Sequence, residues 1–297
     1  MSIFIKNLSK SFGDLPALKD ITLTLENSSI TSIVGPNGSG KTTLLKCIGT
    51  LLTADGGEIE YKGIDKKNIR KNISFVLEGS KSLYNNLTVW ENIRYFLEIK
   101  RTNFILKQKE VNYYLELFDL INKKKTLVSN LSTGMRQKVS IIIALVQDSK
   151  ILLLDEPSLG LDFESVNMLK TALKKMKDEK IIIITSHDIS LIEDISDYIV
   201  VLDKGILKYK GEMKEFKSIT KNIKISIELD RSPSDDFKIK LMNYSNRLEC
   251  ENNFIKGIVS INTLNDLLEE IALSKYKIKN LETNATFEDN FCSILNS

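Results

Sequence analysis

A glycine-rich stretch at residues 35–43 constrains the fold of this chain most strongly. It reads Gly-Pro-Asn-Gly-Ser-Gly-Lys-Thr-Thr, follows an apolar run at residues 30–34 and precedes a helical apolar pattern at residues 44–48. Glycines let the backbone approach an anion closely, and the N–H groups of such a loop and of the next helical turn point at the anion. An apolar strand, a glycine loop and a helix in this order predict a phosphate-binding loop (P-loop).

Two side chains of this loop have separate predicted tasks. Lys41 is expected to place its charge near the β- and γ-phosphates of a nucleoside triphosphate, and Thr42 to offer its hydroxyl to Mg²⁺. The alternative is a surface glycine loop that happens to contain a lysine. We expect the other residues of the stretch to wrap the nucleotide as well: Gly35, Pro36, Asn37, Gly38, Ser39, Gly40 and Thr43.

Carboxylates and a histidine follow two further apolar strands. Residues 151–154 are apolar without a break and end in Asp155 and Glu156, and the chain's one histidine, His187, follows the apolar run 181–184. Unbroken apolar strands suit a parallel sheet buried on both faces, whose carboxyl edge binds ligands. Asp155 is expected to hold Mg²⁺, Glu156 to act as general base on a water, and His187 to donate to the γ-phosphate. The alternative for the two acids is a solvated strand end.

Composition and charge narrow the class of protein. The chain has 297 residues, a formal net charge of +3 and three scattered cysteines. Because cations and anions are interspersed, nucleic acid is not expected as a partner, and neither a disulfide framework nor a metal-binding cysteine motif is indicated. No signal peptide or apolar run of spanning length is present, so we expect a cytoplasmic protein that reaches a membrane only through a partner.

The periodicity predicts two domains. Residues 1–216 are expected to form an α/β core with antiparallel strands at 3–8 and 20–26 and a helical insertion at about 83–148, where Thr88 is a candidate N-cap. Residues 217–297 are expected to form a small α+β domain with the order β-α-β-β-α-β. In a turn cluster at residues 11–14, Phe12 is either a core aromatic or a flat surface for an adenine ring.

Six motifs in a fixed order resemble the nucleotide-binding subunits of ABC transporters. Beyond the P-loop and the Asp155–Glu156 pair, they are the signature-like stretch at residues 131–135, the D-loop-like stretch at 158–162, the switch-like His187 and the aromatic Phe12. The resemblance covers residues 1 to about 215 and implies a P-loop NTPase core that binds ATP and Mg²⁺. It also implies a second ATPase subunit, most simply another copy of this chain, whose nucleotide would contact Ser132, Gly134 and Asp162. Separate transmembrane permease subunits would complete the transporter at the inner face of the cell membrane.

The chain departs from the family pattern at two places. Glu78 stands where the family usually has glutamine, and it is expected to reach Mg²⁺ or the attacking water; the alternative is a solvated acid at a strand end. Thr133 and Met135 stand where the signature usually has glycine and glutamine. Because Ser132 and Gly134 are kept, the phosphate contacts are expected to remain.

The sequence therefore predicts an ATPase subunit of an ABC transporter. By family analogy, Glu78 and the C-terminal extension favour an exporter of drugs, antibiotics or peptides. The competing hypotheses are a soluble ABC ATPase that moves no solute and a regulator that binds nucleotide without hydrolysing it. A single cassette without a long coiled coil argues against the first, and the intact catalytic set argues against the second.

Overall fold

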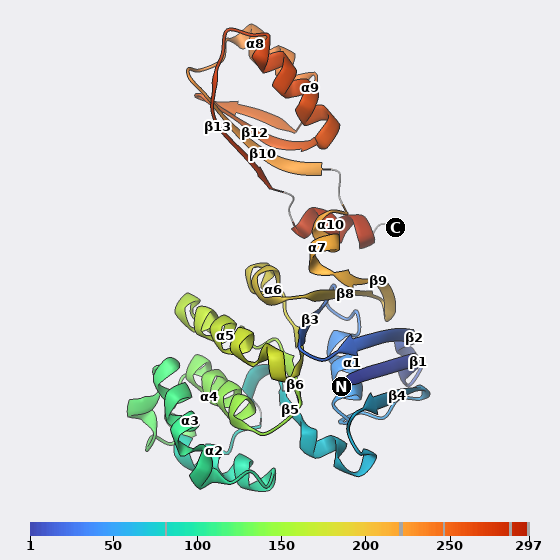
Figure 1. Cartoon of the computed structure of the whole chain (residues 1–297), viewed down its shortest axis with the longest axis vertical. Coiled ribbons are helices and arrows are strands. Elements are labelled where there is room, and N and C mark those ends of the chain that lie inside the picture. The colour runs from blue at the N-terminus through green and yellow to red at the C-terminus, as the bar shows by residue number, and fades with distance from the viewer. Residues whose placement is uncertain (81, 220–221, 246, 285–286, 296–297) are drawn as a thin grey trace. The chain divides into compact units, whose positions relative to one another are not determined.

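The computed structural model describes residues 1–80, 82–219, 222–245, 247–284 and 287–295 (Figure 1). The chain divides into two compact units, Met1–Met213 and Lys214–Ser297, called here the first and second units. Each unit has its own sheet structure and its own buried apolar cluster. Among the described residues, no helix combines the length and the apolar character that crossing a bilayer requires.

A six-stranded sheet forms the centre of the first unit. Its strand order is β5-β6-β7-β3-β8-β9, and all neighbours are parallel except the β8–β9 pair. Leu152 and Leu154 belong to one apolar cluster, whereas Ile151 and Leu153 belong to another, so the sheet is covered on both faces as its unbroken apolar strands predict. The strands are β3 (Ser29–Val34), β5 (Ile73–Val76), β6 (Ile151–Asp155), β7 (Ile181–Thr185), β8 (Tyr198–Asp203) and β9 (Ile206–Glu212).

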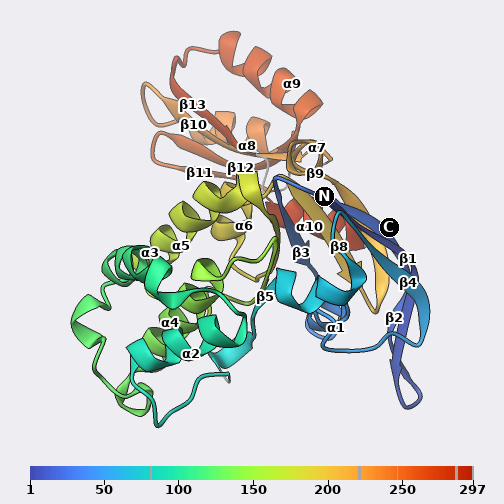
Figure 2. The same ribbon diagram turned by 60° about the horizontal axis from the view of Figure 1, so that its bottom comes forward.

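An antiparallel sheet of order β2-β1-β4 lies beside it in the first unit, as Figure 2 shows. Its strands are β1 (Ser2–Phe12), β2 (Leu15–Glu26) and β4 (Gly56–Lys62). Ile21, Leu23 and Leu25 are buried between exposed neighbours, which confirms the alternation expected of a half-solvated strand. β1 and β2 are longer than predicted because their pairing continues to Phe12 opposite Leu15 at the turn.

Helices cover the central sheet, and the P-loop immediately precedes the first of them. α1 (Lys41–Ile48) follows the loop, and Gly49 is its C-cap. A Cβ on Gly49 would lie 2.7 Å from the Phe75 ring, so the helix stops where the backbone packs directly against β5. Two further helices follow β6 and β7, namely α5 (Phe163–Met176) and α6 (Ile189–Ile195).

The insertion between β5 and β6 is helical, as predicted. It contains α2 (Val89–Ile99), α3 (Phe104–Leu117) and α4 (Thr133–Val146), which share one apolar cluster with one face of the sheet. Thr88 caps α2 in a reciprocal box with Glu91, which confirms its predicted role. Short 3-10 turns join the elements of the first unit: Lys66–Asn72, Glu78–Ser80, Ile121–Lys123, Val128–Asn130 and Lys177–Glu179.

The second unit begins within α7 (Met213–Lys217) and contains a four-stranded antiparallel sheet. The strand order β11-β12-β10-β13 and the chain order β-α-β-β-α-β confirm the predicted split arrangement. One face packs against two helices through a cluster that includes Ile227, Leu241 and Leu267. The elements are β10 (Asn222–Leu229), α8 (Asp235–Met242), β11 (Leu248–Glu251), β12 (Phe254–Ser260), α9 (Ile261–Ala272), β13 (Ile278–Asn284) and α10 (Phe287–Leu295).

Candidate nucleotide-binding site

The P-loop holds the Lys41 side chain inside its own curve. Lys41 is only 8% exposed, and its Nζ donates to the carbonyl oxygens of Gly35 at 2.8 Å and Pro36 at 3.1 Å. Burial lowers the pKa of Lys41, while the negative charges of Glu156 and Asp155 act in the opposite direction. Among the described residues the ammonium group has carbonyl partners but no carboxylate in hydrogen-bond contact, and a phosphate would stabilise its charge.

The start of α1 is open to an anion. Its N-cap is Gly40, at φ 104°, which provides no side-chain cap for the N–H groups of the first turn. A Cβ on Gly40 would lie 2.5 Å from the carbonyl oxygen of Ala17, so glycine is required for both its φ and its packing. Ser39 Oγ is buried without a hydrogen-bond partner among the described residues. These unsatisfied donors fit a phosphate group.

Asp155 joins the P-loop helix to the carboxyl edge of the sheet. Its Oδ1 accepts from Thr42 Oγ1 at 3.0 Å and from Thr185 Oγ1 at 2.7 Å. A hydroxyl and a carboxylate in contact are ligands of the kind that Mg²⁺ takes beside a nucleotide. The donor set therefore fits the metal predicted at Thr42 and Asp155. Sequence reasoning missed Thr185, which ends an all-isoleucine run in β7.

Glu156 is held beside His187 in an uncommon backbone conformation. Its φ is +46°, a conformation that costs a non-glycine residue roughly 1–2 kcal/mol. The Glu156 N–H donates to Thr185 O at 3.0 Å and to Thr185 Oγ1 at 3.1 Å, and these bonds hold the turn. The carboxylate accepts from the His187 N–H at 3.2 Å, and its Oε1 lies 3.3 Å from His187 Nε2.

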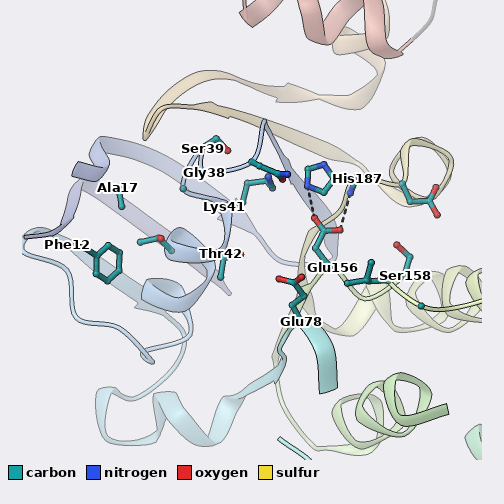
Figure 3. Close-up of a pocket in the computed structure, with 16 residues that line it drawn as sticks. Phe12, Ala17, Gly38, Ser39, Lys41, Thr42, Glu78, Glu156, Ser158 and His187 are labelled. Atoms are coloured by element: carbon teal, nitrogen blue, oxygen red, sulfur yellow. Dashed lines mark hydrogen bonds and ion pairs between the residues drawn. The ribbon is translucent and has the colours of Figure 1, made fainter. Parts of the chain in front are cut away.

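Burial raises the pKa of Glu156, although His187 and Lys41 partly oppose this shift. A raised pKa makes a carboxylate more basic when it is ionised, which suits proton abstraction near neutral pH. His187 has a half-exposed side chain, with 55% of its surface accessible, and it faces the same space as Glu156 (Figure 3).

Lys41, Thr42, Glu156 and His187 line one cavity of about 710 Å³, whereas the buried Asp155 contacts Thr42 without being a lining residue. Figure 3 shows the Phe12 ring at one end and the Glu156–His187 pair at the other, with Lys41 and Thr42 between them. Phe12 is 54% exposed, so it is not a core aromatic, and its ring is free to receive a flat ligand. Glu78 also lines the cavity. Its other lining residues are Ala17, Asn37, Gly38, Ser39, Gly40, Thr43, Ser158, Leu159, Gly160 and Asp188.

Five predicted nucleotide contacts lie outside the lining of this cavity: Gly35 and Pro36, whose carbonyls accept from Lys41, and Ser132, Gly134 and Asp162. Ser132 caps α4 by accepting from the Met135 N–H at 3.2 Å, and Asp162 caps α5 by accepting from the Ser165 N–H at 2.8 Å. A Cβ on Gly134 would lie 2.5 Å from the carbonyl oxygen of Gly160, so the signature-like and D-loop-like stretches pack directly on one another. Within one copy, the start of α4 therefore lies outside the cavity, although Ser158, Leu159 and Gly160 of the D-loop-like stretch line it.

Related proteins with assigned functions match most of this chain. The profile of the ABC transporter family matches residues 18–159. The sulfate/thiosulfate import ATP-binding protein CysA of Mesostigma viride is 34% identical over 265 residues, which cover 88% of this chain and 72% of that protein. The glutamine transport ATP-binding protein GlnQ of Geobacillus stearothermophilus is 32% identical over 238 residues, covering 77% and 98%.

The chain belongs to the ABC transporter ATP-binding family. Solved structures agree with this assignment. An ATP-binding subunit of an ABC transporter superposes with a TM-score of 0.69 at 25% identity, covering 73% of this chain and 92% of that one. The dimeric ATP-binding cassette MJ0796, solved in a post-hydrolysis state with ADP and Pi, gives a TM-score of 0.64 at 27% identity, covering 71% and 98%.

Family membership confirms the predicted fold class and the predicted activity. ABC ATP-binding subunits hydrolyse ATP to drive transport, and their cassettes have the P-loop NTPase fold found in the first unit. The family assignment also confirms that ATP is the nucleotide.

Proposed function

We propose that the 710 Å³ cavity binds Mg²⁺–ATP and that its residues carry out hydrolysis. One observation carries this proposal: three separate segments, at residues 41–42, 155–156 and 187, place Lys41, Thr42, Glu156 and His187 around a single cavity, with Asp155 in contact with Thr42. A glycine loop that lay on the surface without a catalytic role would not require a partly buried base and a hydroxyl–carboxylate pair opposite it.

Each group has a role that follows from its contacts. Lys41 and the open start of α1 bind and orient the phosphates, while Phe12 offers a face to the adenine ring. Glu156 accepts the proton of the attacking water, and His187 orients Glu156 and donates to the terminal phosphate. Thr42 and Asp155 would hold Mg²⁺, which neutralises phosphate charge when it is bound. Glu78, on the same cavity, is proposed to contact the metal or its water.

A second copy would supply the remaining contacts. Ser132 and Gly134 are at the start of α4, outside this copy's own cavity lining, and the related MJ0796 cassette is dimeric. We therefore assign both residues, together with Asp162, to the nucleotide held by a partner copy. ATP would then join two copies, and hydrolysis would separate them.

A groove beside the loop 79–88 is the proposed contact for a permease subunit. It has a volume of about 470 Å³, and its lining includes Phe75 of β5, Phe96 of α2, Ile143 of α4, Ser82 of the loop and Lys100, which follows α2. A helix or loop of a separate transmembrane subunit fits a groove of this size with an apolar wall. Glu78 precedes the same loop, so the contact would be connected by a short segment to the nucleotide cavity.

The names of the relatives do not support the exporter hypothesis. The CysA relative, named for import, matches 265 residues, which is more than the 213 residues of the first unit, so the likeness extends into the second unit. The C-terminal extension therefore does not distinguish an exporter from an importer. The relatives favour import as the direction of transport.

Purification of the tagged chain from its native membranes tests the proposed function. We expect a membrane protein with several spanning helices to co-purify, and the reconstituted complex to hydrolyse ATP faster when its substrate is present. A chain that hydrolyses ATP fully but never co-purifies with such a protein would be a soluble ATPase instead.

A further inference from the structure

The turn that joins α2 to α3 combines exposed aliphatic side chains with uncompensated positive charge. Residues 99–109, called here the α2–α3 tip, contain four lysines or arginines and no acidic residue. Ile99 is 58% exposed, Ile105 75% and Leu106 79%. Single exposed aliphatics are ordinary, but three within eight residues among cations form an apolar and basic patch.

Local packing fixes the outward direction of these side chains. Phe104 is 8% exposed, and its ring packs edge-to-face on Trp90 with centroids 5.0 Å apart. Asn103 caps α3 by accepting from the N–H groups of Ile105 at 3.0 Å and Leu106 at 3.4 Å. Because Phe104 is anchored inward and the backbone is capped, Ile105 and Leu106 are held toward solvent.

Most of the positive charge at the tip has no acidic partner. Arg101 and Lys109 are exposed and form no ion pair with any described residue, while Lys100 Nζ donates only to backbone carbonyls, those of Arg70 and Ile73. Lys107 alone is neutralised, by Glu110 and Asp148 at 2.7 Å each. The patch therefore attracts a negatively charged surface.

The tip lies at the end of the sheet opposite the nucleotide cavity. Lys100 binds the carbonyl of Ile73, where β5 begins, whereas Glu78 of the cavity follows the other end of that strand. Four residues of strand separate the two places by roughly 13 Å. Lys100 also lines the groove proposed for the permease, so docking there would bring the tip close to a bilayer.

We propose that the α2–α3 tip contacts the headgroup layer of an anionic membrane, with Ile105 and Leu106 inserted and Arg101 and Lys109 on lipid phosphates. That the tip lies near a membrane rests on the proposed function, whereas its binding of anionic lipid depends only on residues of this chain. An anionic lipid surface fits the tip because residues 99–109 carry only positive charge and expose aliphatic side chains among the cations, which is the combination that a headgroup layer binds.

Co-sedimentation of the full chain with lipid vesicles tests the proposal. We expect binding to vesicles containing phosphatidylglycerol, little binding to phosphatidylcholine vesicles, and loss of binding as salt is raised. The double variants Arg101→Gln/Lys109→Gln and Ile105→Ser/Leu106→Ser should each weaken binding by about tenfold. ATPase activity in solution should stay unchanged in both double variants, and this result would show that the variants are folded.

Two matched double variants serve as controls. Lys208→Gln/Lys279→Gln removes two exposed charges elsewhere, and Ile239→Ser/Leu273→Ser removes an isoleucine 63% exposed and a leucine 86% exposed from the second unit. Both controls should bind vesicles as the wild type does. The proposal is overturned if the wild type ignores anionic vesicles, or if the tip variants bind no worse than the controls. A wild-type chain that hydrolyses no ATP would instead count against the proposed function.

Discussion

The starts of α1 and α4 are both candidate phosphate contacts, but they are satisfied in different ways. At α1 the N-cap is Gly40, which has no side chain, and the buried ammonium of Lys41 follows it. At α4 the N-cap is Ser132, whose hydroxyl already accepts from the Met135 N–H. The N–H groups at the start of α1 therefore have no side-chain cap, whereas one N–H at the start of α4 is already capped.

This difference predicts unequal contributions to binding. A charged hydrogen bond from Lys41 contributes roughly 1.5–3 kcal/mol, whereas an anion at a capped helix start gains roughly 0.3–1 kcal/mol. The P-loop should then determine affinity for ATP in one copy. The start of α4 should act mainly in the second copy, on closure around nucleotide that is already bound.

Glu156→Gln should have the largest effect on turnover. Because it should leave ATP binding intact, it lets the contributions of the α1 and α4 starts be compared without turnover. Without a base, turnover should fall by about 10²- to 10⁴-fold, while ATP binding and ATP-dependent pairing persist. In the wild type, turnover should decline on acidification at a pH above the ordinary glutamate range, because the raised pKa protonates the base there. Steady-state assays across pH measure both effects. Rapid turnover by the variant would remove Glu156 as the base.

Lys41→Ala tests the start of α1. Loss of a charged hydrogen bond to phosphate should weaken ATP binding by about 10- to 100-fold, measured by equilibrium dialysis. The nucleotide-free protein should lose little stability in urea unfolding, because burial of the ammonium group already lowers its pKa. Lys41→Met is the control that keeps the apolar stem. Unchanged affinity would be fatal to the assigned role of the P-loop.

Ser132→Asp tests the start of α4 without removing its cap. Aspartate caps helices as well as serine does, so the free energy of unfolding should not fall. Its charge should repel a partner's phosphate and reduce turnover by about tenfold. ATP affinity of the separated copy should remain at the wild-type value. If turnover is unaffected, Ser132 is only a helix cap.

Thr185→Val probes the connection between Asp155 and Glu156. It removes one hydrogen bond to each, and at roughly 1 kcal/mol per bond kcat should fall about fivefold or more. KM should change less, because Thr185 is not among the residues lining the cavity. Thr185→Ser should restore kcat. A KM effect alone would indicate a role in binding.

Glu78→Gln should have the smallest effect. Removing a charge near the metal should raise the Mg²⁺ concentration for half-maximal activity by a few-fold, with Glu78→Asp closer to the wild type. A Mg²⁺ titration at fixed ATP measures this shift. Identical titration curves would identify Glu78 as a solvated acid at the strand end.

Local patterns predicted much of this molecule because the physics of those elements is local. The P-loop, the buried strands before Asp155 and His187, and the Thr88 cap each depend on residues close together in sequence. The placement of Asp162 was harder, because the same aspartate suits a helix cap or a partner's nucleotide. Its carboxylate caps α5, while Gly160 nearby lines the cavity.

Contacts between distant segments could not be predicted from the sequence. Thr185 reads as an ordinary strand residue, and only the β6–β7 register places its hydroxyl beside Asp155. Ala17 carries no chemical signal, yet its carbonyl fixes how closely Gly40 approaches. The exposure of Ile105 and Leu106 depends on Phe104 turning inward, which apolar periodicity does not distinguish from the reverse.

Mixing two impaired variants tests most directly whether two copies share each ATP. Lys41→Ala and Ser132→Asp copies should each hydrolyse ATP poorly alone. A mixed pair contains one site with both an intact P-loop and an intact α4 start, so the account predicts that activity returns on mixing. If the mixture hydrolyses ATP only as fast as the average of the two variants measured separately, each copy works alone and the account is contradicted.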